Sequence, residues 1–100
     1  MTLTDDRINE LNAQESDYTI EFFKNFIQNI TVYEDEDIWV LDKPAGLLSV
    51  DGRILKVSLQ SRLLKVNPKI KLIHRLDMDT SGLIIFAKNF AAQTHISKQF

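Results

Sequence analysis

The chain has 100 residues, of which 44% are hydrophobic and 26% are charged, a composition typical of one compact domain. It has no cysteine, which excludes disulfides and thiolate metal sites. It has no apolar run near the roughly 20 residues that span a bilayer and no secretory signal, so we exclude a membrane partner and expect a cytoplasmic protein. The net charge of −2 hides an asymmetry, because residues 1–42 hold eleven acidic and two basic side chains, whereas residues 43–100 hold three and ten.

The first 30 residues predict a polar leader followed by one amphipathic helix. The first dozen residues show no apolar period and are interpreted as a frayed leader. From Ser16 onward the period becomes helical, and Ser16 or Asp17 is a candidate N-cap. The apolar residues recur mostly at spacings of three and four, which indicates one buried stripe: Tyr18, Phe22, Phe23, Phe26, Ile27 and Ile30. We expect this helix to pack on its own domain.

Residues 31–46 predict a hairpin that ends in a tight bend. β-Branched and aromatic residues at 31–33 and 38–41 flank the acidic tetrad 34–37. The tetrad lacks the glycine and the spacing of a calcium loop, so we interpret it as a solvated turn. Pro44 and Gly46 then end the second strand, with Lys43 at the lip of the bend.

The remaining chain predicts two helices and a strand around a polar segment. Residues 56–66 have a helical apolar period, with Ser58 as the cap and Asn67-Pro68 as the stop. We expect the basic side chains of this helix to lie on or near its open side: Lys56, Arg62 and Lys65. Residues 83–87 predict a short apolar strand, and Asn89 is a candidate cap for a last helix. The elements together predict an α+β fold, part of a mixed, largely antiparallel sheet with flanking helices.

The polar segment HRLDMDTSG, residues 74–82, admits several interpretations. A structured turn is one, because Asp, Thr and Ser satisfy backbone N–H groups and glycine permits a positive φ. A phosphatase of the aspartate-nucleophile type would place threonine where Ser81 stands. A glycosidase would need a second carboxylate several ångströms away. A metal site on His74, Asp77 and Asp79 would place the metal cation beside the positive charge of Arg75, which is unfavourable.

A fourth interpretation rests on resemblance. HRLDMDTSGLIIFAKN resembles the signature HRLD-x-x-TSG of the RluA-type RNA pseudouridine synthases, which three branched aliphatic positions follow. Upstream, VYEDEDIWVLDKPAGLLSV is similar to the strand, acidic turn, strand and Lys-Pro-x-Gly loop with which those enzymes begin. The likeness covers roughly residues 31–100, and GLLSVDGR most resembles the RluA branch, which acts on ribosomal and transfer RNA. Two motifs in the right order make it specific.

The resemblance implies a role for each matching residue. The catalytic aspartate falls on Asp77, and Arg75 matches the arginine that displaces the target nucleotide from the RNA stack. His74, Thr80, Ser81 and Gly82 match positions that shape the loop, and Met78 and Asp79 fall on the variable pair. Lys43 matches the lysine of the Lys-Pro-x-Gly loop, in a structural role or in RNA contact. We assign Asp77 as catalytic and the following residues to RNA binding: His74, Arg75, Thr80 and Lys43.

The implied function is isomerisation of uridine to pseudouridine in a ribosomal or transfer RNA stem-loop, without cofactor or metal. A cluster of basic residues between Lys43 and Arg75 can attract such a polyanion, although a solvated lysine-rich surface explains it as well. We divide the chain into a leader and helix, 1–30, and the N-terminal portion of a catalytic domain, 31–100. Later family motifs have no counterpart here, so we expect this chain alone to be inactive. The alternative is a non-catalytic RNA-binding or interaction domain that retains the motif as a turn.

Overall fold

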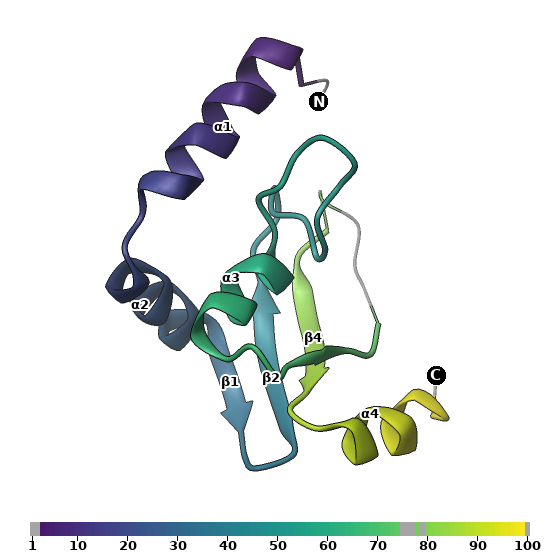
Figure 1. Ribbon diagram of the computed structural model, residues 1–100. Helices are drawn as coiled ribbons and strands as arrows, with labels where there is room; N and C mark the ends of the chain where they lie inside the picture. The colour runs from purple at the N-terminus through teal and green to yellow at the C-terminus, as the bar shows by residue number, and fades with distance from the viewer. Residues whose placement is uncertain (1–2, 75–77, 79, 100) are drawn as a thin grey trace.

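A four-stranded sheet with helices against it forms the body of the computed structural model, which describes residues 3–74, 78 and 80–99 (Figure 1). The helices are α1 (Asp5–Asp17), α2 (Ile20–Ile30), α3 (Leu59–Val66) and α4 (Phe90–Ser97). The strands are β1 (Thr31–Glu34), β2 (Ile38–Lys43), β3 (Lys71–Leu72) and β4 (Gly82–Ala87). Their order is β1-β2-β4-β3, and each neighbouring pair is antiparallel. The α+β class with a largely antiparallel sheet is therefore confirmed.

The predicted hairpin is present as β1 and β2, and Asp35 shapes its turn. The Asp35 carboxylate accepts hydrogen bonds from the backbone N–H groups of Asp37 (2.8 Å) and Ile38 (2.9 Å) and from the Tyr33 hydroxyl (2.8 Å). These bonds, with Ile38 first, favour the charged form and hold the pKa of Asp35 below its ordinary value of 3.8. The acidic tetrad thus contains one residue that organises the turn, which local side-chain bonding by aspartate explains.

One face of the sheet meets α2 and α3, and the core lies between them. Strand alternation turns Trp39 and Leu41 of β2 toward these helices, where they pair across the sheet with Phe86 and Ile84 of β4. The helices and the loops beside them contribute the other buried members of the core cluster: Ile27, Leu47, Leu59, Leu63 and Ile70. The amphipathic pattern of α2 is confirmed at Phe23 and Ile27, which are buried, whereas Phe22 of the predicted stripe is exposed and Tyr18 precedes the helix.

The N-terminus differs from its prediction. The expected frayed leader is helix α1, which begins after Thr4, whose side chain accepts a hydrogen bond from the Arg7 N–H. Asp5 and Asp6 in the first turn suit the positive end of the helix dipole. Ser16 and Asp17 belong to the last turn of α1, so the cap expected at one of them is wrong. Thr19 caps α2 instead, through a bond from the Phe22 N–H.

The helix boundaries around the sheet follow their predicted caps. Ser58 and Ser61 form a reciprocal capping box at the start of α3, and Asn67 ends that helix. Asn89 caps α4 by accepting from the Ala92 N–H at 2.8 Å. None of the helices in the described part of the chain is long and apolar enough to cross a bilayer.

Candidate functional site

The motif, residues 74–82, lies in the chain between β3 and β4, and its last residue, Gly82, begins β4 beside the end of β2. Three of its predicted residues, Arg75, Asp77 and Asp79, lie outside the described residues. His74, Met78, Thr80, Ser81 and Gly82 are described, and so is Lys43, which pairs with Gly82 across the sheet. The described contacts of the motif are therefore those of its two ends and of position 78.

Lys43 is a fully buried cation that joins the two motif segments. It is the last residue of β2, and alternation from Trp39 and Leu41 places it on the core face. Its Nζ donates hydrogen bonds to the carbonyl oxygens of Pro44 (3.0 Å), Leu47 (2.5 Å) and Met78 (3.2 Å). A buried ammonium group needs such acceptors, because losing its water without them is costly. This burial favours the structural role over direct RNA contact.

Gly46 makes a second connection between the same segments. Its N–H donates to the Met78 carbonyl oxygen at 2.8 Å, so this oxygen receives both Gly46 and Lys43. Gly46 has a φ of 88°, in a region that residues with a Cβ rarely adopt. An added Cβ there would meet nothing within 4 Å, so backbone conformation and not space requires the glycine. The Lys-Pro-x-Gly loop is thereby fixed to the backbone beside position 77.

His74 anchors the first end of the motif to the sheet. Its Nε2 accepts a hydrogen bond from the Ile85 N–H at 3.1 Å, on the side of β4 where β3 has already ended. The imidazole thus supplies the acceptor that a strand partner would otherwise supply to this N–H. Thr80 and Ser81 at the other end of the motif are exposed. Of the described RNA-binding candidates, Thr80 is the one open to solvent.

The basic cluster does not form one surface. Lys43 is buried, and Arg62, expected on the open side of α3, is also largely buried, which corrects that prediction. The Arg62 guanidinium bonds both carboxylate oxygens of Glu15, at 2.7 and 2.8 Å, and lies 4.6 Å from the ring centroid of Phe26. The sequence carries no local signal for this pair, because Glu15 and Arg62 are 47 positions apart.

The remaining cations lie at different ends of the sheet. Arg53 and Lys56 are exposed in the loop between β2 and α3, whose base contacts Met78. Lys71 pairs with Ala87, the last residue of β4, at the opposite end, and Lys69 precedes it by two residues. Lys65 is exposed, with its Nζ 4.4 Å from the Phe23 ring centroid. Charge near the motif therefore comes from a smaller group of residues than the sequence cluster.

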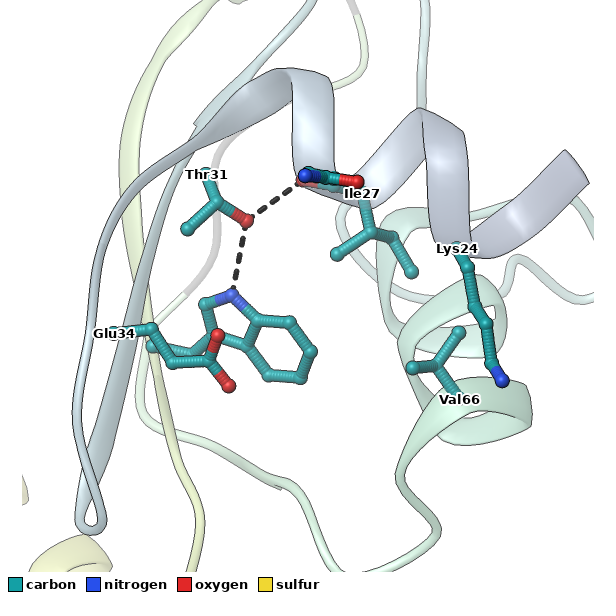
Figure 2. A pocket seen from close by; sticks show the side chains of 7 residues that line it. Lys24, Ile27, Thr31, Glu34 and Val66 are labelled. Atoms are coloured by element: carbon teal, nitrogen blue, oxygen red, sulfur yellow. Dashed lines mark hydrogen bonds between the residues drawn. The ribbon is translucent and has the colours of Figure 1, made fainter. Parts of the chain in front are cut away.

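One hollow, lined by described residues, lies away from the motif. A hollow of about 400 Å³ lies between α2, the hairpin and α3. Figure 2 shows side chains that line it, among them Lys24, Glu34 and Val66. The Trp39 Nε1–H donates to Thr31 Oγ1 (3.0 Å), and that hydroxyl donates to the Ile27 carbonyl oxygen (2.7 Å). These polar groups already have partners, and the hollow offers no reactive pair. Among the described residues, no group of three or more His, Asp or Glu side chains is placed to hold a metal ion.

Comparison with known proteins identifies similar sequences and folds. The sequence model of the family described as RNA pseudouridylate synthase matches residues 37–100. The dual-specificity RNA pseudouridine synthase RluA of Vibrio vulnificus is 49% identical over 71 residues, which are 69% of this chain and 28% of that protein. The protein of the same name from Escherichia coli K12 is 42% identical over 73 residues, 71% of this chain and 33% of its own length. The chain thus spans a third or less of the length of these relatives.

A solved structure shares the fold. The human protein named RNA pseudouridylate synthase domain containing 4 superposes with a TM-score of 0.62 at 20% sequence identity. The superposition covers 80% of this chain and 31% of the human one. At this identity the likeness concerns the fold, and it extends beyond the residues that the family sequence model matches.

Proposed function

Because the chain belongs to the RNA pseudouridylate synthase family, we propose that the complete protein isomerises specific uridines to pseudouridine in ribosomal or transfer RNA, with Asp77 as the catalytic residue. The observation that supports this site is the double connection at Met78, whose carbonyl oxygen receives Gly46 and Lys43. The residue next to Asp77 is thereby attached to the buried end of β2. A fixed backbone is what a single catalytic carboxylate requires for its positioning.

The proposed chemistry needs one carboxylate and no cofactor. The N1–C1′ bond of the uridine breaks, the uracil turns, and C5 bonds to C1′ while its proton is transferred to N1. Every atom of the product comes from the substrate. Asp77 acts either as a nucleophile at the sugar or as a base on it. The uracil must first leave the stack, at a cost of a few kcal/mol, and Arg75 fills the space because its planar guanidinium both stacks and hydrogen-bonds.

The other assigned residues take roles that agree with their surroundings. We propose that His74 positions the motif from the sheet edge, because its Nε2 is engaged by the Ile85 N–H. Thr80 is an exposed residue of the motif, and we propose it for contact with RNA. Lys43 supports the segment from within the core. The substrate places the activity in the cytoplasm, where ribosomal and transfer RNA are found.

Asp77→Asn in the complete protein tests the proposal. The change is nearly isosteric but removes the charge and the nucleophile, so pseudouridine formation should fall by at least about 10³-fold with little change in unfolding free energy. Asp79→Asn, at one of the variable motif positions, is the matched control and should stay within a fewfold of wild type. Turnover retained by the Asp77 variant would refute the catalytic assignment. RNA binding by a wild-type protein that forms no pseudouridine would favour the non-catalytic domain.

A further inference from the structure

The loop between β2 and α3, residues 44–58, is held along its length. Its base is fixed by the Gly46–Met78 bond described above. Farther along, the carbonyl oxygens of Leu48 and Ser49 accept from the N–H groups of Leu59 and Gln60 at the start of α3 (2.8 and 3.0 Å). The first N–H groups of a helix have no acceptor within that helix, so the loop supplies the acceptors that the start of α3 needs. The loop is therefore held in place by hydrogen bonds at the end of the sheet where β2 finishes, and it arches over this end in Figure 1.

The tip of this loop, residues 52–56, is closed on itself and bound to α1. The Gly52 N–H donates to the Leu55 carbonyl oxygen at 2.9 Å. The side-chain amide of Asn12 donates to the Ile54 carbonyl oxygen (3.0 Å) and accepts from the Lys56 N–H (2.8 Å). Two bonds of this kind reproduce the pairing that a neighbouring strand would supply. One amide on α1 thus fixes the backbone on both sides of Leu55.

Helix α1 connects the tip to α3. Asn12 and Glu15 are three residues apart and lie on the same side of the helix. Asn12 holds the tip, and Glu15 forms the two-point ion pair with Arg62 of α3. Asp5, Asp6 and Glu10 of the same helix are exposed. Their charge disfavours a polyanion along α1 itself, so α1 has the character of a support and not of a binding surface.

The tip presents two cations and one apolar side chain to solvent. Arg53 and Lys56 are exposed, and Ile54 between them is 56% exposed. Backbone phosphates attract the cations, and a base or ribose can pack on the apolar side chain. Three other described cations of the sequence cluster are less well placed, because Lys43 and Arg62 are buried and Lys71 lies at the far end of β4.

We propose that the tip is an RNA-contact surface and that α1 braces it through Asn12. This inference rests on the proposed function, which makes RNA the substrate. Arg53 and Lys56 bind phosphates of the RNA that reaches the motif, and Ile54 packs on a nucleotide beside them. Asn12 is a positioning residue, because it holds the backbone that carries these side chains. The contact positions the substrate without selecting a base.

A charge-matched pair of variants tests the surface in the complete protein with an RNA stem-loop. Arg53→Gln/Lys56→Gln removes two positive charges from the tip, and Lys69→Gln/Lys71→Gln removes two from the opposite end. Each lost phosphate contact lowers the slope of log affinity against log salt by about 0.7 to 0.9. The tip variant should lose about 1.5 in slope and roughly tenfold or more in affinity at about 0.1 M salt, while the control changes less than about twofold. Equal losses in the two variants would overturn the proposal.

Asn12→Ala tests the brace, and Asn9→Ala, at an exposed site on the same helix, is its control. The Asn12 variant should raise KM for the stem-loop about three- to tenfold with kcat little changed, and its Lys56 amide should lose hydrogen-exchange protection. In the Arg53→Gln/Lys56→Gln background it should weaken binding no further. Additive losses, or an Lys56 amide as protected as before, would overturn the brace. A wild-type protein that forms no pseudouridine refutes the proposed function, whereas an active one with unaltered tip variants refutes only this inference.

Discussion

Two basic side chains, Lys43 at the end of β2 and Arg62 in α3, are withdrawn from water by different means. Lys43 is 0% exposed and donates to three backbone carbonyl oxygens from two segments of the chain. Arg62 meets one carboxylate, that of Glu15, beside the ring of Phe26. These three acceptors of Lys43 are main-chain atoms, which a change of their side chains does not remove, whereas the carboxylate that Arg62 meets belongs to a replaceable side chain. The carbonyl contacts are therefore lost by substitution of Lys43 itself, and the ion pair by substitution of either Arg62 or Glu15.

The largest effect should come from Lys43→Met, which keeps much of the length but removes the donor. Carbonyl oxygens left without it inside the core cost about 1–3 kcal/mol each, so we expect a loss of about 3 kcal/mol or more in unfolding free energy. Urea unfolding followed by circular dichroism measures it. Lys88→Met is the control, because Lys88 pairs near the surface with Glu34 and should cost less than about 1 kcal/mol. Equal costs at the two lysines would contradict the carbonyl site.

A smaller loss of stability should follow from substitution of Arg62, and a second substitution at Glu15 should restore most of it. Arg62→Met leaves the Glu15 carboxylate, 5% exposed, without its ion-pair partner, and we expect a loss of about 2–3 kcal/mol. The double variant Glu15→Gln/Arg62→Met should recover most of this loss, because neither charge then remains buried. A double-mutant cycle by urea unfolding gives the coupling, expected at about 1.5 kcal/mol or more. Additive single effects would show that the pair does not act as a unit.

The smallest effect concerns the hairpin turn, which lacks a buried charge. The folded pKa of Asp35 is lowered chiefly by the Ile38 N–H, so its stabilising contribution is present above the unfolded value of 3.8 and is lost as pH falls through the folded pKa. Asp35→Asn should therefore be less stable than wild type near pH 6, and the two should converge below about pH 3.8. Urea unfolding from near pH 6 to well below pH 3.8 tests this, with Glu36→Gln in the same turn as the control. A difference that does not change with pH would exclude the carboxylate as its cause.

Elements with local signals could be predicted from the sequence. Ser58 and Asn89 were expected as caps and are caps, because capping depends on residues within three positions. Helix α1 was missed because it attaches through polar residues and has no apolar stripe to reveal it. Its contacts from Asn12 and Glu15 reach 42 to 47 positions along the chain, where no local pattern can point.

The candidate site was predicted in part. The motif and its order along the chain were sufficient to indicate the family, which the comparisons confirm. The burial of Lys43 was not anticipated, although alternation from Trp39 and Leu41 predicts a core-facing position at 43. The roles of Arg75 and Asp77 remain predictions, since these residues lie outside the described part of the chain.

The two hydrogen bonds to the Met78 carbonyl oxygen determine which nearby positions tolerate substitution. Gly46 and Lys43 both bind the main-chain oxygen of residue 78, and any amino acid at that position supplies the same atom. Residue 78 can therefore be replaced without removing the joint between the two motif segments, whereas Gly46, with its φ of 88°, cannot be exchanged freely. The side chain next to Asp77 is thus open to variation while its anchorage is kept. Random libraries at position 78 should therefore contain many proteins that still fold.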